Sequence, residues 1–220
     1  KAWREQGVES PWFKRWFGKS KVVDAEGKPL VVYHGSGQRN LTEFKSGRKS
    51  SRMLMMASFP VETQGHFFSA STEDAESYGD HVTSAYLKAE RPLVPINENE
   101  FNSKTPEKNK KIWDDYEYIL EPVIEKYNGK DVVDLMGEVV FEVTQELRDS
   151  GEWVNKVAKD ALHWAIFDNP DVVKRMRERG YDSARVYEPN DKSGESWFVM
   201  DSNQIKSATA NTGEFSPDNA

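Results

Sequence analysis

The sequence predicts a single α+β domain over residues 1–220, and three observations support this class. Short apolar runs typical of strands lie in the first half of the chain and again near its end, and helical periodicity dominates between them. The 220 residues suffice for one domain that buries about 70% of its unfolded surface. The chain has no cysteine, which excludes a disulfide framework, a thiolate metal site and a cysteine nucleophile.

The first part of the chain predicts one helix followed by strands. Trp12 and Trp16 are spaced i, i+4 and are therefore expected on one face of a short helix. A strand, a turn over residues 24–28 and a buried strand over residues 30–33 follow. The next predicted elements are strands over residues 65–71, 82–87 and 92–96, and a helix over residues 72–79 that Thr72 caps.

Residues 102–180 are expected to form a helical block inserted into this β-rich domain. A first helix follows Thr105-Pro106 and ends at Pro122, and Asp131 opens a second. Further helices are predicted around residues 153–164 and from Asn169-Pro170 to Gly180.

After this block the sequence returns to strand patterns. Strands are expected over residues 184–187 and 196–200, and a turn over residues 201–206 leads into a last strand. The tail over residues 207–220 is small and polar, so we expect it to be flexible.

Motifs that mark several classes of enzyme are absent from the sequence. None of the four histidines stands at metal-ligand spacing from another, so no metal is expected. The chain has no Gly-Lys-Ser/Thr phosphate loop, no Gly-x-Gly-x-x-Gly and no Gly-x-Ser-x-Gly elbow, so a serine hydrolase has no support. No apolar run approaches the ~20 residues of a membrane span, and we expect no membrane association.

The net charge of −7 argues against general nucleic-acid binding, which needs a positive surface. This charge is unevenly distributed, because residues 39–52 contain one acid, Glu43, and several cations. These cations are Arg39, Lys45, Arg48, Lys49 and Arg52. Two interpretations stay open for this long irregular stretch: a solvated loop, or a surface that faces an anionic ligand or a target.

Three segments far apart in the sequence place chemistry-bearing residues beside predicted strands. They are His34-Gly35-Ser36 after a buried strand, Phe67-Phe68 in the next strand with Tyr78 in the following helix, and Ser196 preceded by Glu195 near the end of the chain. Taken singly, each pattern is more often structural than functional.

In this order the segments resemble the motifs of ADP-ribosyltransferases of the diphtheria-toxin and poly(ADP-ribose) polymerase kind. Leu30 to Ser36 is similar to the first motif, Gly65 to Tyr78 to the second, and Ser196 to Ile205 to the third. The sequence most resembles the ADP-ribosyltransferase domains of phage and mobile-element polyvalent proteins. Those domains have in common with this sequence the Phe13-Lys-x-Trp-Phe17 opening, Gly180-Tyr181-Asp182 and Gln204-Ile-Lys-Ser-Ala208.

The resemblance covers residues 1–100 and 180–215. It implies a split β-sandwich, in which two small, mainly antiparallel sheets surround an NAD cleft. It also implies that His34 hydrogen-bonds the adenosine ribose of NAD and that the Gly35 backbone holds the nicotinamide carboxamide, with Ser36 beside it.

The second motif implies the rings that stack on nicotinamide. Phe67 occupies the family's tyrosine position and Tyr78 matches the second stacking tyrosine, so the two rings would sandwich the nicotinamide. Ser69 and Ser196 complete the expected NAD-binding residues.

The catalytic glutamate departs from the family pattern, because its position falls on Ser196 in this sequence. Glu195 comes one residue earlier and would face the other side of the strand unless a bulge turns it inward. Glu188, at the end of the preceding strand, is the second candidate after Glu195. A site without a glutamate is the third. A carboxylate is expected because cleavage of the nicotinamide–ribose bond develops oxocarbenium character.

We therefore expect a mono-ADP-ribosyltransferase that transfers ADP-ribose from NAD to a macromolecular acceptor and releases nicotinamide. A protein acceptor is favoured over nucleic acid, the chain is expected to be a monomer, and no metal is required. The expected role is a phage or mobile-element effector or toxin in the cytoplasm of the bacterial host or target cell. The alternative is a catalytically inactive NAD- or ADP-ribose-binding domain, or a phage structural interaction domain that retains the fold.

Overall fold

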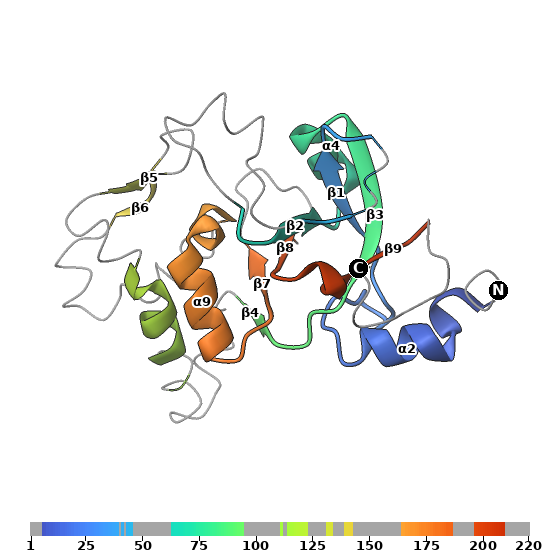
Figure 1. The fold of residues 1–220 in the computed structure, drawn as a ribbon, viewed down its shortest axis with the longest axis horizontal. Helices are drawn as coiled ribbons and strands as arrows, with labels where there is room; N and C mark the ends of the chain where they lie inside the picture. The colour runs from blue at the N-terminus through green and yellow to red at the C-terminus, as the bar shows by residue number, and fades with distance from the viewer. Residues whose placement is uncertain are drawn as a thin grey trace.

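In the computed structural model the described residues are 6–39, 41, 43–45, 63–94, 111, 114–122, 131–133, 139–142, 164–186 and 196–209. Within them, a mixed sheet runs through the middle of the molecule with helices packed beside it (Figure 1). The fold is therefore α+β, which confirms the class that the sequence predicts.

Seven strands form the central sheet, in the order β4-β7-β8-β2-β1-β3-β9. They are β1 (Val32–Ser36), β2 (His66–Ser69), β3 (His81–Leu87), β4 (Pro92–Leu93), β7 (Ser183–Val186), β8 (Ser196–Val199) and β9 (Ile205–Ser207). Neighbouring strands are antiparallel, except that β4 and β7 are parallel. Strands from both ends of the sequence thus lie side by side, because β8 pairs with β2 and β9 pairs with β3.

The expectation of two small sheets is not confirmed, because hydrogen bonds join all seven strands. The join between β1 and β2 is nevertheless narrow, with Tyr33 and Ser69 as its single register pair. In contrast, β1 pairs with β3 from Val32 to Ser36, and β2 pairs with β8 along its whole length. We call this narrow join the β1–β2 junction.

Side-chain caps explain where three of the helices begin. They are α2 (Pro11–Phe17) with cap Ser10, α4 (Thr72–Tyr78) with cap Ser71, and α9 (Pro170–Glu178) with cap Asn169. The prediction that Thr72 caps α4 is wrong, because the extended backbone continues through Ser71 and its side chain accepts from Asp74 N. The predicted end of α9 is confirmed, with Gly180 at φ +78°.

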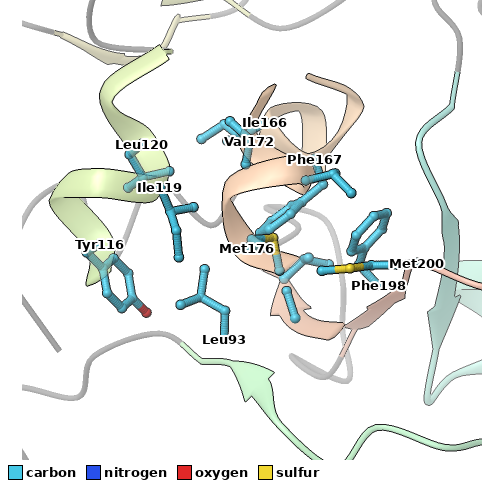
Figure 2. Close-up of a cluster of buried hydrophobic side chains, with 13 residues drawn as sticks. Leu93, Tyr116, Ile119, Leu120, Ile166, Phe167, Val172, Met176, Phe198 and Met200 are labelled. Atoms are coloured by element: carbon cyan, nitrogen blue, oxygen red, sulfur yellow. The ribbon is translucent and has the colours of Figure 1, made fainter. Parts of the chain in front are cut away.

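One face of the sheet, which we call the α9 face, is covered by α9, by η2 (Trp164–Asp168) and by the helix over residues 114–122. Figure 2 shows its apolar cluster, with Tyr116, Ile119 and Leu120 pointing toward Met176 and Leu93. The cluster comprises Leu93, Tyr116, Ile119, Leu120, Ile166, Phe167, Val172, Val173, Met176, Ala184, Val186, Phe198 and Met200.

A second apolar cluster includes Phe68, and we call its side of the sheet the Phe68 face. Its members are Val22, Val32, Phe68, Ala85, Leu87, Ala89, Trp197, Val199 and Ile205. A third cluster packs Phe13, Trp16 and Phe17 of α2 beside Tyr86, after the short η1 (Gly7–Glu9). Trp12 and Trp16 both lie in α2 at the predicted i, i+4 spacing, but only Trp16 is buried and Trp12 is 51% exposed.

The predicted helix from Asp131 is wrong for the residues that the structure describes. Residues Asp131–Val133 form β5 and Val139–Glu142 form β6, and the two strands pair in an antiparallel sheet. The spacing of Val132, Val139 and Val143 suits a helix, but adjacent β-branched residues favour strands. The insertion of residues 102–180 as a unit stays a prediction, as does the helix around residues 153–164, most of which lies outside the described residues.

The predicted turn over residues 24–28 is confirmed, since Asp24 Oδ1 accepts hydrogen bonds from the backbone N–H of Glu26 and Lys28. Two predicted boundaries differ. The first is that β1 continues through Ser36 rather than ending before His34, because β3 pairs with it up to that residue. The second is that Ser207 belongs to β9 and pairs with Ala85, and the expected tail beyond residue 209 lies outside the described residues.

Candidate functional site

Of the residues singled out from the sequence, those that the structure describes lie on β1, β2, α4 and β8, at or beside the β1–β2 junction. His34, Gly35 and Ser36 form the end of β1 beyond the register pair of Tyr33 and Ser69. In the described strands, none of these three residues has a register partner on β2. The two strands therefore separate at this point.

His34 bridges the two strands where they separate. Its Nδ1–H donates a hydrogen bond to the carbonyl oxygen of Phe67, over 2.8 Å. A carbonyl oxygen can only accept, so Nδ1 carries the proton. Burial lowers the pKa of His34, and the hydrogen bond to Phe67 opposes this effect. The neutral ring therefore has Nε2 as a hydrogen-bond acceptor.

Aromatic and imidazole rings surround His34 on the Phe68 face. The His34 ring lies 5.2 Å from that of Phe44 and 5.4 Å from that of Phe68, and Phe44 lies 5.3 Å from His66. Burial, with His34 nearby, lowers the pKa of His66 to about 4. The sequence analysis missed Phe44 and His66. Strand alternation could have placed His66 beside Phe68, but nothing local indicates that Phe44 packs on this strand.

Helix α4 packs directly on the end of β1. A Cβ atom on Gly35 would lie 1.7 Å from the carbonyl oxygen of Ala75, and one on Gly79 would lie 2.2 Å from the carbonyl carbon of Ser36. Both positions therefore require glycine for the close approach of two backbones. Ser36 itself stabilises the following turn, because its Oγ donates to the carbonyl of Gln38 over 3.1 Å.

The two expected stacking rings come from different elements. Phe67 lies in β2, where its ring packs 5.1 Å from that of Phe198 in β8. Tyr78 ends α4 and is 49% exposed, beside the Gly79 contact with β1. Phe67 therefore lies in β2 and Tyr78 lies next to the contact with β1, and these two strands meet at the β1–β2 junction.

Ser69 and Ser196 lie directly opposite each other as register partners on β2 and β8. Both are buried, with exposed fractions of 5% and 0%. Ser69 Oγ accepts a hydrogen bond from Ser71 N over 3.0 Å and donates one to Asp74 Oδ2 over 3.4 Å. Asp74 is a further buried carboxylate that the sequence analysis missed, although its spacing from Ser71 is that of a capping pair.

The candidate residues occupy both faces of the sheet. Successive side chains of a strand point to opposite faces, so Phe67, Ser69 and Ser196 lie on the α9 face with Phe198. His34 packs against Phe68 and therefore lies on the Phe68 face. The two groups are linked at the β1–β2 junction by the hydrogen bond from His34 to the Phe67 carbonyl.

The two candidate glutamates, Glu188 and Glu195, lie outside the described residues. The predicted order between them stays a prediction. Of the basic stretch over residues 39–52, the described part includes Arg39 and an ion pair of 2.9 Å between Lys45 and Glu43.

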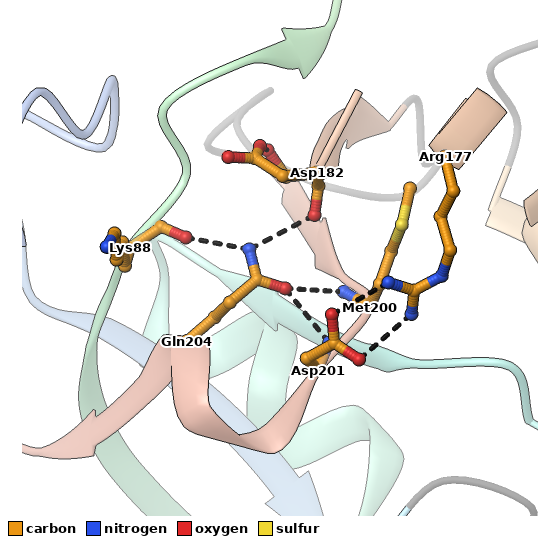
Figure 3. Close-up of polar contacts among 7 residues, drawn as sticks. Lys88, Arg177, Asp182, Met200, Asp201 and Gln204 are labelled. Atoms are coloured by element: carbon orange, nitrogen blue, oxygen red, sulfur yellow. Dashed lines mark hydrogen bonds and ion pairs between the residues drawn. The ribbon is translucent and has the colours of Figure 1, made fainter. Parts of the chain in front are cut away.

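Gln204 of the third motif makes four hydrogen bonds that fix the chain after β8, and we call this set of bonds the structural lock. The Gln204 amide, at the end of η3 (Ser202–Gln204), accepts from the backbone N–H of Met200 and Asp201 and donates to the carbonyls of Lys88 and Asp182 (Figure 3). Both oxygens of Asp201 pair with Arg177 of α9, at 2.8 and 2.9 Å. This motif thus ties α9, β8 and the chain before β4 together.

With this geometry in place, the comparisons define the class of protein. The family described as ADP-ribosyltransferase in polyvalent proteins matches residues 24–215, so the chain belongs to that family. No curated protein matches the sequence. A solved structure titled "Crystal structure of an anti-CRISPR protein" is similar at 13% identity, covering 81% of this chain and 94% of that chain with a TM-score of 0.38. That similarity carries no functional argument.

Among the described residues, no group of three or more His, Asp or Glu side chains is placed to hold a metal ion. In the same part of the chain, no helix has the length and apolar character of a membrane span.

Proposed function

We propose that this domain transfers ADP-ribose from NAD to a macromolecular acceptor and releases nicotinamide. Family membership supports the transferase class. The observation that carries the proposal is His34, whose ring is held by the Phe67 carbonyl with Nε2 as acceptor where β1 and β2 separate. An acceptor nitrogen in that position suits a ribose hydroxyl.

The two-sided arrangement supports a long, bent ligand. A molecule that contacts His34 on the Phe68 face and Phe67 on the α9 face has to pass the end of the β1–β2 junction. A dinucleotide has two separate ribose–base units and meets this requirement. In this proposal His34 binds the adenosine ribose, and the Gly35 backbone binds the carboxamide.

Phe67 and Tyr78 would stack on the nicotinamide, and such stacking contributes about 0.5–1.5 kcal/mol beyond area burial. Because Phe67 is braced by Phe198, its ring orientation is set before a ligand binds. Ser36 and Ser196 complete the contacts in this proposal.

The reaction breaks the bond between ribose C1′ and the nicotinamide nitrogen, and the electron pair leaves with neutral nicotinamide. The acceptor attacks C1′ and loses its proton to solvent or to a basic group. A carboxylate near the ribose stabilises the oxocarbenium character of the transition state. Glu195 is the first candidate for this carboxylate and Glu188 the second.

The acceptor in this proposal is a protein, because the net charge of −7 disfavours nucleic acid. We further propose a role as an effector or toxin domain of a mobile element, acting as a monomer in the bacterial cytoplasm. One observation favours an inactive NAD-binding domain as the second candidate function: a buried serine, Ser196, stands where the family has its glutamate.

The test is nicotinamide release from NAD by the purified protein, together with the shift in melting temperature that NAD causes. We expect release by the wild type and at least a tenfold lower rate for His34→Ala, or about 1.4 kcal/mol. Trp12→Ala, which removes an exposed ring on α2, is the matched control. NAD-dependent stabilisation without release would favour the inactive domain, and the absence of both would overturn the proposal.

A further inference from the structure

Asp74 is a buried carboxylate beside the candidate site. Its exposed fraction is 8%, although it lies in the first turn of α4 where acidic side chains normally face solvent. The neighbouring residue Glu73 shows this ordinary behaviour and is exposed. A carboxylate loses hydration when it is buried, so hydrogen-bond partners compensate for the burial of Asp74.

One of these partners is the Ser69 hydroxyl rather than the Ser71 N–H of a capping box. The cap of α4 is already made by Ser71, whose Oγ accepts from Asp74 N over 3.3 Å. In a capping box the Asp74 side chain would accept from Ser71 N in return. That N–H instead donates to Ser69 Oγ over 3.0 Å, and the Ser69 hydroxyl in turn donates a hydrogen bond to Asp74 Oδ2 over 3.4 Å.

This chain of hydrogen bonds leads to residue 196. Ser69 is the register partner of Ser196, and cross-strand partners have Cβ atoms about 4.5–5.5 Å apart. The Asp74 carboxylate is therefore one hydrogen bond and one cross-strand step from the position where the family has its glutamate.

The position of Asp74 is fixed by the packing of α4. The contacts of Gly35 with Ala75 and of Gly79 with Ser36 hold the helix against β1. Ser77 Oγ also donates to the Asp74 carbonyl over 2.6 Å. A charge held in this way requires little reorganisation during a reaction, which is the condition for effective electrostatic stabilisation.

We propose that Asp74 acts as a positioning carboxylate of the site, supplying through Ser69 the negative charge that residue 196 lacks. This inference rests on the proposed function. In this reaction the C1′–N bond of NAD breaks, its electron pair leaves with nicotinamide, and the acceptor forms the new bond to C1′ and releases its proton to solvent. Asp74 orients the Ser69 hydroxyl and through it favours the positive charge that develops on the ribose.

The test compares two acids of the same helix turn. We expect Asp74→Asn to lower the rate of nicotinamide release at saturating NAD at least tenfold, with little change in the Kd for NAD or in the melting temperature. Glu73→Gln removes one charge from the same turn and should retain the wild-type rate. Asp74→Glu should recover part of the lost rate, which a purely structural role of Asp74 would not explain.

If Asp74→Asn does not fold, Ser69→Ala carries the test, because it removes the connecting hydroxyl and leaves both strands intact. A wild-type rate in folded Asp74→Asn, or in Ser69→Ala when the first variant is unfolded, would overturn the inference and leave the proposed function standing. Failure of the wild-type protein to release nicotinamide would overturn the proposed function itself.

Discussion

The two faces of the central sheet bury opposite kinds of titratable group. On the α9 face the groups are acids, namely carboxyls and the phenol of Tyr116, and Asp115 there contacts Lys111 at 2.8 Å, Arg179 at 3.2 Å and the Tyr181 hydroxyl at 2.9 Å. Asp168, at the end of η2, has neither oxygen hydrogen-bonded in the described part of the chain. On the Phe68 face the groups are His34 and His66.

Burial favours the neutral form of both kinds of group. The stability of the folded protein therefore depends on pH in opposite directions for the two. Burial raises the pKa of Asp168 to about 7 and lowers that of His66 to about 4. Between pH 4 and 7 the folded protein holds a proton on Asp168 that the unfolded chain has released, so this contribution to stability is lost as pH rises. For His66 the unfolded chain binds the extra proton, so stability is lost as pH falls.

The largest expected effect is that of Asp168→Asn. Each pKa unit is worth about 1.4 kcal/mol, so ionisation of Asp168 costs up to about 4 kcal/mol at pH 8. The amide avoids this cost, and we expect the variant to be more stable than the wild type at pH 8 but not at pH 4. Urea denaturation at both pH values measures the difference. Asp171→Asn, at an exposed position of α9, is the control, and equal responses of the two variants would refute the assignment.

The second effect concerns the opposite face. Between pH 6.5 and 4, protonation of His66 in the unfolded chain costs the wild type up to about 3 kcal/mol of stability. His66→Gln should remove this acid sensitivity and leave the opposing dependence of Asp168. The free energy of unfolding of both variants, followed from pH 4 to 8, should therefore slope in opposite directions. Parallel curves would break the comparison between the faces.

The third effect is steric and tests how α4 is held at the β1–β2 junction. In Gly35→Ala the new methyl group meets the Ala75 carbonyl oxygen, and such overpacking costs about 1–3 kcal/mol. Gly37→Ala has no atom within 4 Å of the new Cβ and is the matched control. Thermal melting should separate the two variants. If Gly35→Ala keeps the wild-type melting temperature, α4 does not pack on β1 as described.

The last effect, similar in size to the third, separates the structural lock from the titrating groups. Gln204→Ala leaves two backbone N–H groups and two carbonyls short of a partner, and we expect a loss of about 2 kcal/mol. An amide does not titrate, so the loss should be equal at pH 5 and 8. Asn203→Ala changes an exposed neighbour and should leave stability unchanged. A loss that varies with pH would show that the lock is coupled to one of the two faces.

Much of the fold could be predicted because local signals agree with the final structure. The caps and proline of α9, the turn at Asp24 and the strands of the three motifs all depend on residues close in sequence. The hairpin of β5 and β6 was missed because the spacing of its valines satisfies both a helix and a strand. Local sequence does not decide between helix and strand in such a case, and tertiary packing does.

The candidate site divides in the same way. The sequence by itself determined the family, the order of the three motifs and the identity of His34, Gly35, Phe67 and Tyr78 as candidates, because motifs are patterns of residue type at fixed spacing. Only the tertiary structure decided that His34 and Phe67 lie on opposite faces, joined at a narrow junction. It also placed Phe44 against His34 and buried Asp74 beside Ser69. These contacts depend on strand register and on how a helix is seated, and neither is encoded within a single short segment of the chain.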